Sequence, residues 1–319
     1  MNPADLPDAV VRAVRCAVES GELGADVVVP ERVVVERTRP GGVGDYATPV
    51  AFQIAKAAGR APGEVAGVLA RRLGGEPGIE SVEVTGPGFV NFLLPPPSAP
   101  RIVSEVVGQG AARPTAAPAL DLDIELRERV VRESVLRILR GQAGGDRQDG
   151  PGRFPVAPLA KRDGDVVRRY GLGAARWAML CVPVRETPEF SERLLVQGEE
   201  NEFFRVRYAH ARSRALLRNA AGLGFGPEPG EVDAPALLRV LAEHRLVLEA
   251  AGHHRAPERL ARYLVELADA LLDFQYRVLP HGDEKPSAAH RARLALAEAA
   301  GAVLAGGLAL LGIDAPEHL

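Results

Sequence analysis

The feature that most constrains the fold is a helical period that repeats through the second half of the chain. Apolar residues recur three and four positions apart in five segments: Val166–Leu180, 199–222, Ala234–Ala250, Pro257–Leu279 and 288–312. This spacing places apolar side chains on one face of a helix, so each segment predicts an amphipathic helix. Such faces must pack on one another, and the sequence therefore predicts an all-helical bundle over residues 156–319.

The first hundred residues mix helix and strand signals. Helical patterns in Leu6–Glu19, ATPVAFQIAKAAG and PGEVAGVLARRL precede two β-rich runs, IESVEVT and FVNFLL, which are separated by Gly-Pro-Gly. Glycine and proline between alternating runs predict a β-hairpin. We expect the fold class to be α+β, with a small α+β domain over residues 1–108 and a charged helix plus linker over 109–155. Few apolar residues occur in 141–155, which is typical of a flexible linker.

Composition limits the classes of partner. The 319 residues include 39 basic and 42 acidic side chains, a net charge of -3, so no global field attracts a polyanion and any nucleic-acid binding depends on local clusters. Cys16 and Cys181 lack C-x-x-C spacing, which indicates a reducing compartment. Asp5 and Asp8 stand where a signal peptide needs positive charge, and no apolar run reaches membrane-spanning length. We expect a cytoplasmic protein with no membrane partner.

One predicted helix, NEFFRVRYAHARSRALLRN at residues 201–219, concentrates arginine. At about 100° per residue three of its arginines fall in one narrow stripe: Arg207, Arg214 and Arg218. Tyr208 lies between this arginine stripe and the solvent. After Glu202 the helix carries no carboxylate, which favours an anionic partner with phosphates and planar bases. The alternative is a solvated face whose ion-pair partners are the glutamates of residues 199–202.

Motifs for chemistry are absent from the sequence. The first histidine is His210, so no Ser-His or Cys-His pair exists in the preceding 209 residues, and no G-x-x-x-x-G-K-[ST] loop occurs. GGVGDYA has dinucleotide-fingerprint spacing, but Pro40 interrupts the strand before it and Asp45 would stand where a pyrophosphate binds. No cluster has metal-ligand spacing. We expect no catalytic residue, no cofactor and no metal.

The arginine-rich segment resembles the helix that opens the anticodon-binding (DALR) domain of arginyl-tRNA synthetases. The family's V-x-Y-A-H-A-R run is matched by Val206, Tyr208, Ala209, His210, Ala211 and Arg212. RLARYLVELADALLDFQY and RLALAEAAGAVLAGGLALLGIDAPEHL resemble later helices of that domain. GLGAARWAML is similar to its G-x-D-A-A-R-Y helix, with Gly173 in place of the usual Asp. The resemblance implies that this domain binds the anticodon arm of tRNA through Arg207, Tyr208, Arg212, Arg214 and Arg218.

GDYATPVAFQIAKAAGRAPGEVA and IESVEVTGPGFVNFLL resemble the N-terminal additional domain, which in this family grips the corner of the tRNA. In FVNFLL the strand period puts Asn91 on the face of Phe89 and Phe92 on the other. An exposed aromatic there would stack on an unpaired loop base while Asn91 bonds the base edge. The alternative is that both phenylalanines belong to the core.

The family's catalytic domain should lie between these regions, yet residues 98–156 are too few to hold it and contain no histidine for its H-x-G-H signature. Of the K-M-S-K-R signature and its surroundings, only Lys161, Arg162 and Gly164 of PLAKRDGD align, and the Met-Ser pair does not appear. We therefore expect a catalytically inactive, tRNA-binding paralogue with arginine tRNA as its ligand. It would hold or present tRNA to a partner such as an enzyme that uses aminoacyl-tRNA.

Two alternatives belong to other functional classes. In a split arginine-tRNA ligase, a separate chain would supply the catalytic domain. In a protein-interaction scaffold that has lost RNA binding, acidic residues or a partner would cover the arginine stripe.

Overall fold

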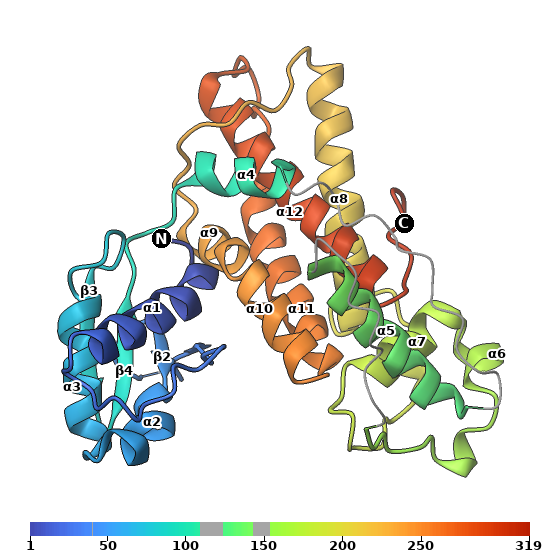
Figure 1. Cartoon of the computed structure of the whole chain (residues 1–319). Helices are drawn as coiled ribbons and strands as arrows, with labels where there is room; N and C mark the ends of the chain where they lie inside the picture. The colour runs from blue at the N-terminus through green and yellow to red at the C-terminus, as the bar shows by residue number, and fades with distance from the viewer. Residues whose placement is uncertain (40, 109–123, 143–153) are drawn as a thin grey trace. The chain divides into compact units, whose positions relative to one another are not determined.

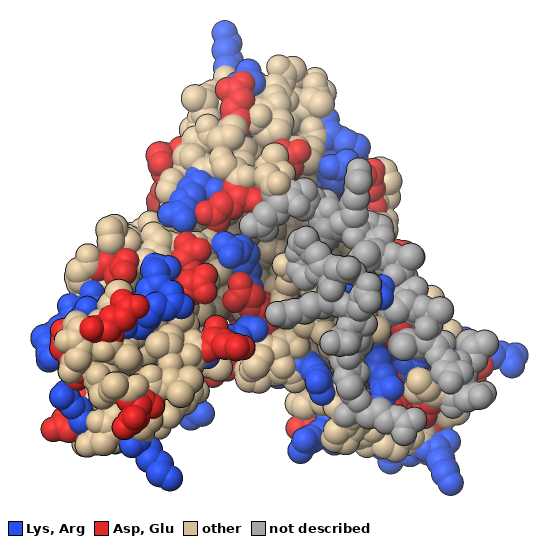
Figure 2. Space-filling model, in the orientation of Figure 1, with Lys and Arg blue, Asp and Glu red and all other residues tan. Residues whose placement is uncertain are grey.

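A computed structural model describes residues 1–39, 41–108, 124–142 and 154–319, which form two compact units, Met1–Pro96 and Pro97–Leu319 (Figure 1). The predicted α+β class is confirmed, because the first unit contains a four-stranded antiparallel sheet and the second is helical. On the face drawn in Figure 2, acidic and basic side chains are interspersed. This mixture agrees with the small net charge.

The first unit packs helices on a short sheet. Its helices are η1 (Pro3–Asp5), α1 (Leu6–Glu19), α2 (Val50–Ala58) and α3 (Pro62–Leu73), and its strands are β1 (Glu36–Arg37), β2 (Tyr46–Thr48), β3 (Ser81–Thr85) and β4 (Phe89–Leu93). The strand order is β1-β2-β4-β3, with every pair antiparallel. Helix α3 packs on β3 and β4 and also contacts α1 and α2. The buried face of β4 carries Val90 and Phe92, both 0% exposed.

The predicted hairpin is formed by β3 and β4, whose register pairs Ser81 with Leu93 and Thr85 with Phe89. Its turn requires glycine. Gly88 has φ 152°, and a Cβ at this position would lie 2.8 Å from the Cβ of Pro62. The close approach seats the turn on the first residue of α3 and fixes which side of β4 faces the core.

The second unit is a helical bundle. Its elements are α4 (Ala99–Gly108), α5 (Leu126–Gln142), η2 (Lys161–Asp163), α6 (Val166–Tyr170), α7 (Leu172–Leu180), η3 (Glu192–Leu195), α8 (Glu202–Gly222), α9 (Pro235–Ala242), α10 (His244–His253), α11 (Pro257–Phe274), η4 (Gln275–Arg277) and α12 (Ala288–Leu310). The segment predicted as one helix over 166–180 is divided into α6 and α7, because Gly171 has φ 78° and ψ 159°, a conformation outside the helical region.

Three helices, α8, α11 and α12, pack together at the centre of the bundle. Glycines of α12 permit the contact. A Cβ at Gly301 would lie 2.2 Å from Ser213 Oγ of α8, and a Cβ at Gly307 would lie 2.5 Å from a Leu264 methyl carbon of α11. Ser213 Oγ also donates to the Ala297 carbonyl at 2.8 Å. Helix α8 is therefore held firmly along one side, and its other sides are presented in a fixed orientation.

Helix α12 is long and apolar enough to cross a membrane by length and composition, with a mean hydropathy of 1.5 over its most apolar window. However, 72% of that window is buried inside the unit. It is the only described helix that meets this test, and its burial is that of a core helix.

The charged segment before the predicted linker forms α5 and joins the bundle through Arg127, whose side chain is 0% exposed. Its guanidinium donates to the carbonyls of Ala157 (2.6 Å), Pro183 (3.0 Å) and Met179 (3.5 Å). Burial lowers the pKa of Arg127. The three carbonyls satisfy the buried charge and hold α5 against α7 and its flanking segments.

Two of the predicted domain boundaries can be compared with the structure. Helix α4 falls within the predicted first domain, 1–108, but packs on α12 and α9 of the second unit. Most of the predicted flexible linker, residues 143–153, lies outside the described residues.

Candidate nucleic-acid interface

Helix α8 begins at a well-satisfied cap. The Asn201 side-chain oxygen accepts from the backbone N–H groups of Phe203 (3.1 Å) and Phe204 (3.4 Å), while its amide donates to the carbonyls of Leu194 (3.2 Å) and Val196 (2.8 Å). This cap fixes both the start of α8 and the position of residues 194–196 before it. One side of the helix is buried against α11 and α12 by Val206, Ala209, Ser213, Leu216 and Ala220.

A second side of α8, here called the covered face, consists of His210, Arg214 and Arg218 and lies under residues 313–319. His210 Nδ1 is 2.9 Å from the Pro316 carbonyl, and Arg214 Nη2 is 3.2 Å from a Glu317 carboxylate oxygen. Arg218 donates to the Glu317 carbonyl at 3.4 and 3.5 Å and lies 3.4 Å from His318 Nδ1. The sequence predicted no carboxylate beside these arginines, because the helix carries none after Glu202. Glu317, which lies outside the helix, supplies one to Arg214.

The cover combines one buried contact with exposed ones. His210 is 5% exposed, and burial lowers its pKa, so the neutral ring donates through Nδ1–H to the carbonyl. The Arg214 and Glu317 side chains are 42% and 58% exposed. An ion pair this exposed contributes about 0–1 kcal/mol. The Glu317 carboxylate therefore holds Arg214 only weakly.

The third side of α8, here called the open face, consists of Phe204, Tyr208 and Arg212 with the adjoining Gln275 and Tyr276 of η4. The Phe204 and Tyr208 rings stack with centroids 5.7 Å apart, and Tyr208 is 39% exposed. Arg212 Nε donates to Gln275 Oε1 at 2.5 Å, and this bond joins α8 to the end of α11. A stacked aromatic pair beside an oriented guanidinium suits a flat, anionic ligand such as a nucleotide.

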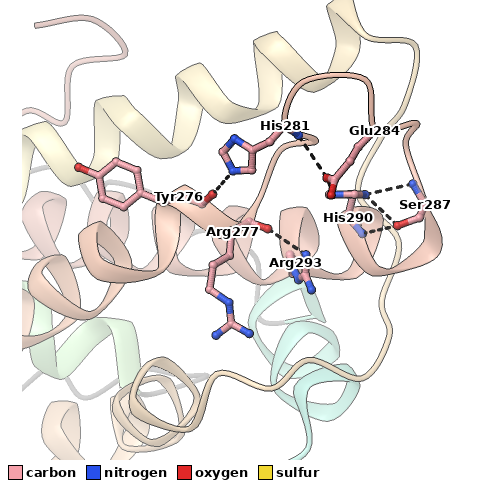
Figure 3. Close-up of polar contacts among 7 residues, drawn as sticks. All are labelled: Tyr276, Arg277, His281, Glu284, Ser287, His290 and Arg293. Carbon is pink, nitrogen blue, oxygen red and sulfur yellow. Dashed lines mark hydrogen bonds and ion pairs between the residues drawn. The ribbon is translucent and has the colours of Figure 1, made fainter.

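The turn after α11 completes the open face and is drawn in Figure 3. The Tyr276 carbonyl lies 2.6 Å from His281 Nε2, and the Arg277 carbonyl accepts from Arg293 Nη1 at 3.1 Å. These bonds hold the backbone, while the Tyr276 ring and the Arg277 guanidinium point away from the polar contacts (Figure 3). Tyr276 is 68% exposed, which for a large aromatic side chain is typical of a binding surface.

A capping box closes the same turn. Ser287 Oγ is 2.8 Å from His290 Nδ1, and Glu284 lies 3.6 Å from His290 Nε2 (Figure 3). Since Ser287 caps the first turn of α12, this Ser-His-Glu arrangement is explained by helix capping.

The three hairpin residues that the sequence predicted to bind RNA differ in their exposure in the structure. Phe92 is fully buried in the core of the first unit, because α3 covers its side of β4, and we remove it from the interface. Asn91 is 5% exposed, and its amide donates to Thr85 Oγ1 at 2.7 Å. Phe89 is 41% exposed and packs edge-on against Phe52, which is 38% exposed, with centroids 5.1 Å apart. The exposed pair on this unit is therefore Phe89 with Phe52, a partner that strand alternation could not identify.

Sequence reasoning also missed Gln275, Tyr276 and Arg277. The available signal was a tyrosine and an arginine that interrupt the apolar period at the end of RLARYLVELADALLDFQYR. Lys161 and Arg162, the remnant of a loop signature, are exposed in the short turn η2. Among the described residues, no group of three or more His, Cys, Asp or Glu side chains is arranged to hold a metal.

Two family models match the chain: the arginyl tRNA synthetase N terminal domain over residues 8–94 and the DALR anticodon binding domain over residues 206–319. A curated relative, the arginine–tRNA ligase of Frankia alni, is 28% identical over 558 positions covering 100% of both chains. Since this chain has 319 residues, at least 239 of the 558 positions face gaps in it.

Two solved structures of arginyl-tRNA synthetases are similar to this chain in fold. The arginyl-tRNA synthetase of Thermus thermophilus is similar with a TM-score of 0.60 at 15% identity, covering 100% of each chain. That of Plasmodium falciparum gives 0.57 at 10% identity, covering 99% of each. The chain thus joins two non-catalytic domains of an aminoacyl-tRNA synthetase. Both domains are domains of arginyl-tRNA synthetases, and the chain belongs to that family.

Proposed function

We propose that this protein binds tRNA, with arginine tRNA as its natural ligand, and that it does not aminoacylate. The observation that carries the proposal is the open face, where Tyr208, Arg212 and Tyr276 stand exposed or oriented on an anticodon-binding domain. Stacking on the two tyrosines and charge from Arg212 are the interactions by which single-stranded loops are held. Arg214 and Arg218 would add phosphate contacts once Glu317 and His318 are displaced from them.

The first unit would contact a second part of the same tRNA. Its model match is to the N-terminal domain of arginyl-tRNA synthetases, and the Phe89–Phe52 pair supplies an exposed aromatic edge for an unpaired base. Asn91 would act through the hairpin, since its amide bonds Thr85. Two joined modules on one RNA raise affinity, because the second contact becomes intramolecular.

Inactivity is supported by the chemistry of the sequence. The two matched domains are the non-catalytic ones, and no histidine precedes His210 to activate an amino acid. A chain that retains tRNA contacts without chemistry would hold or present tRNA to another enzyme, for example one that uses aminoacyl-tRNA. The cytoplasm is where such a substrate is available.

A panel of purified tRNAs in filter-binding assays at several salt concentrations tests this function. We expect arginine tRNAs to bind most tightly, and whole tRNA to bind more tightly than an isolated anticodon stem-loop. We expect no arginine-dependent ATP–pyrophosphate exchange. Equal weak binding of every RNA would contradict tRNA recognition, and steady exchange from protein free of host synthetase would contradict inactivity.

A second candidate, the protein-interaction scaffold, is favoured by one observation. Glu317 and the 313–319 segment cover Arg214 and Arg218, as a surface that has lost RNA binding would be covered. The scaffold predicts that removing this cover leaves tRNA affinity unchanged.

A further inference from the structure

A pocket of about 340 Å³ lies beside the covered face, at the start of α8. Its walls come from the α6–α7 junction, residues 194–197, the first two turns of α8, and Ile313 with Asp314. All of these belong to the second unit. The volume is at the lower end of the roughly 300–1,000 Å³ of small-ligand sites, so the pocket suits a single nucleotide-sized group.

Arg207 brings hydrogen-bond donors to this pocket. Each of the other α8 arginines has a hydrogen-bond or ion-pair partner: Arg205 with Asp269, Arg212 with Gln275, Arg214 with Glu317, and Arg218 with the Glu317 carbonyl. The structure gives the Arg207 guanidinium no hydrogen bond among the described residues. It lies over the Phe203 ring at 5.2 Å from the centroid and interacts with the charge of Asp314.

Partial burial makes these donors valuable to a ligand. Burial lowers the pKa of Arg207, although an arginine stays charged at any physiological pH. A guanidinium that has lost part of its water and gained no acceptor binds an incoming acceptor more strongly than an exposed one.

Aromatic rings form part of the walls, and the absence of a side chain at Gly173 leaves room for one of them. Phe203 and Phe204 line the pocket from α8, and Tyr170 lines it from α6, where its ring stacks on Phe190. A Cβ at Gly173 would lie 3.2 Å from Phe203 Cζ, so any side chain there presses on the ring under Arg207. Asn201 offers nothing to a ligand because both ends of its amide bond the backbone.

The chemistry of the pocket therefore combines aromatic walls, a donor fork from Arg207 and an acceptor from Asp314. Resting on the proposed function, we propose that this pocket binds one unstacked guanine of a bound RNA loop. Arginine makes paired bonds to the O6 and N7 acceptors of guanine, and the carboxylate suits its ring N–H and amino donors. The aromatic walls take the faces of the base. Arg207 is then a specificity-determining residue distinct from the phosphate contacts of its helix neighbours.

The test uses stem-loop RNAs with a seven-nucleotide loop that differ at one position. Each loop position in turn carries guanine, 7-deazaguanine, adenine or no base, and guanosine monophosphate serves as a free-nucleotide probe. At one position we expect wild-type protein to bind guanine about tenfold more tightly than adenine, with 7-deazaguanine weakened because it lacks N7. We expect the free nucleotide to bind far more weakly, since it lacks the phosphate contacts of the loop.

Two variants and a matched control assign the effect. Arg207→Lys keeps the charge and loses the fork, so the guanine preference should fall to about twofold or less while overall affinity changes little. Gly173→Ala, which forces the Phe203 ring to shift, should also reduce the preference. Arg214→Lys makes the same chemical change on the covered face and should preserve it. Thermal melts establish that all three variants fold.

The experiment distinguishes failure of the guanine pocket from failure of the proposed tRNA binding. If wild-type protein binds whole tRNA but no loop position shows a base preference, or if Arg207→Lys retains the preference, the guanine pocket is overturned and the proposed function stands. If guanosine monophosphate binds as tightly as the best loop, the pocket serves a free nucleotide and the RNA assignment is overturned. If wild-type protein binds no tRNA, both proposals fall.

Discussion

The covered and open faces of α8 both carry arginine, and they differ in what lies over it. Arg214 and Arg218 meet Glu317 and its carbonyl, whereas Tyr208 is 39% exposed and Arg212 is oriented by a neutral amide. The first face has its charge already partly neutralised. The second has aromatic surface and positive charge, and in the part of the chain that the structure describes no carboxylate binds Arg212.

This difference shows that arginine density alone does not locate an RNA site. A stripe of three cations is the more conspicuous sequence feature, yet two of its members bind residues 317 and 318 of the same chain. The less conspicuous face gains its character from η4, about 60 residues away in sequence. What an arginine can bind depends on the acceptors that the fold has already given it.

The largest expected effect is on the open face. Replacing Tyr276 by Ala should weaken tRNA binding by tenfold or more, and Tyr208→Ala should act similarly, since stacking contributes about 1–3 kcal/mol per base. Tyr276 is 68% exposed, so its loss should leave thermal stability nearly unchanged. Filter binding with whole tRNA, together with a melting curve, measures both quantities.

Tyr276→Phe is the matched control, because it keeps the ring and removes only the hydroxyl. We expect it to bind like the wild type. If Tyr276→Ala binds tRNA normally, the open face is not the site, and the comparison between the two faces would have to be reversed.

A smaller effect is expected on the covered face. Glu317→Gln removes the carboxylate from Arg214 and leaves the backbone carbonyl that Arg218 uses. Because an exposed ion pair contributes about 0–1 kcal/mol, tRNA affinity should rise by up to about fivefold at low salt. The log–log salt slope should steepen by roughly 0.7–0.9 if Arg214 then contacts one phosphate.

Glu228→Gln tests whether net charge alone explains that gain. Glu228 pairs with Arg291 at 3.1 Å, and its side chain is 66% exposed, so the substitution changes the charge equally without touching α8. Arg214→Ala in the Glu317→Gln background should remove the gain. An equal gain from Glu228→Gln would leave the covered face without a specific role, whereas the scaffold hypothesis predicts no gain from either substitution.

The helices, the hairpin and the family were predictable because their signals are local. Period 3.6, glycine-rich turns and the V-x-Y-A-H-A-R run each occupy fewer than 25 residues. Strand alternation likewise placed Phe89 and Phe92 on opposite faces of β4. It could not say which face is core, because that depends on where α3 packs.

The acceptors of the buried and covered arginines were not predictable from local pattern. Arg127 sits in a charged segment whose composition suggests solvent exposure, yet it bonds carbonyls 30 to 56 residues away. Glu317 reaches α8 across 99 residues from Arg218. A helical wheel counts only the carboxylates of its own helix, so it overstates the free charge of a face that another segment covers.

The smallest expected effect concerns the pH dependence of the cover. Burial and the charge of Arg214 lower the pKa of His210, while the Pro316 carbonyl and Glu317 oppose that shift. Once residues 313–319 undock, the pKa returns toward its ordinary value near 6.5. The docked form therefore binds fewer protons, so docking is fully stable above pH 6.5 and weakens as the pH falls through the docked pKa.

Amide protection factors for residues 313–319, corrected for intrinsic exchange rates, should fall by roughly twofold between pH 7.5 and 6. His318 is a second histidine beside the covered face, 3.4 Å from Arg218, so the comparison is between His210→Asn, which should abolish the pH dependence, and His318→Asn, which should keep it. If only His318→Asn abolishes it, the pH response belongs to the Arg218 contact, and His210 serves purely as a packing group beneath the cover.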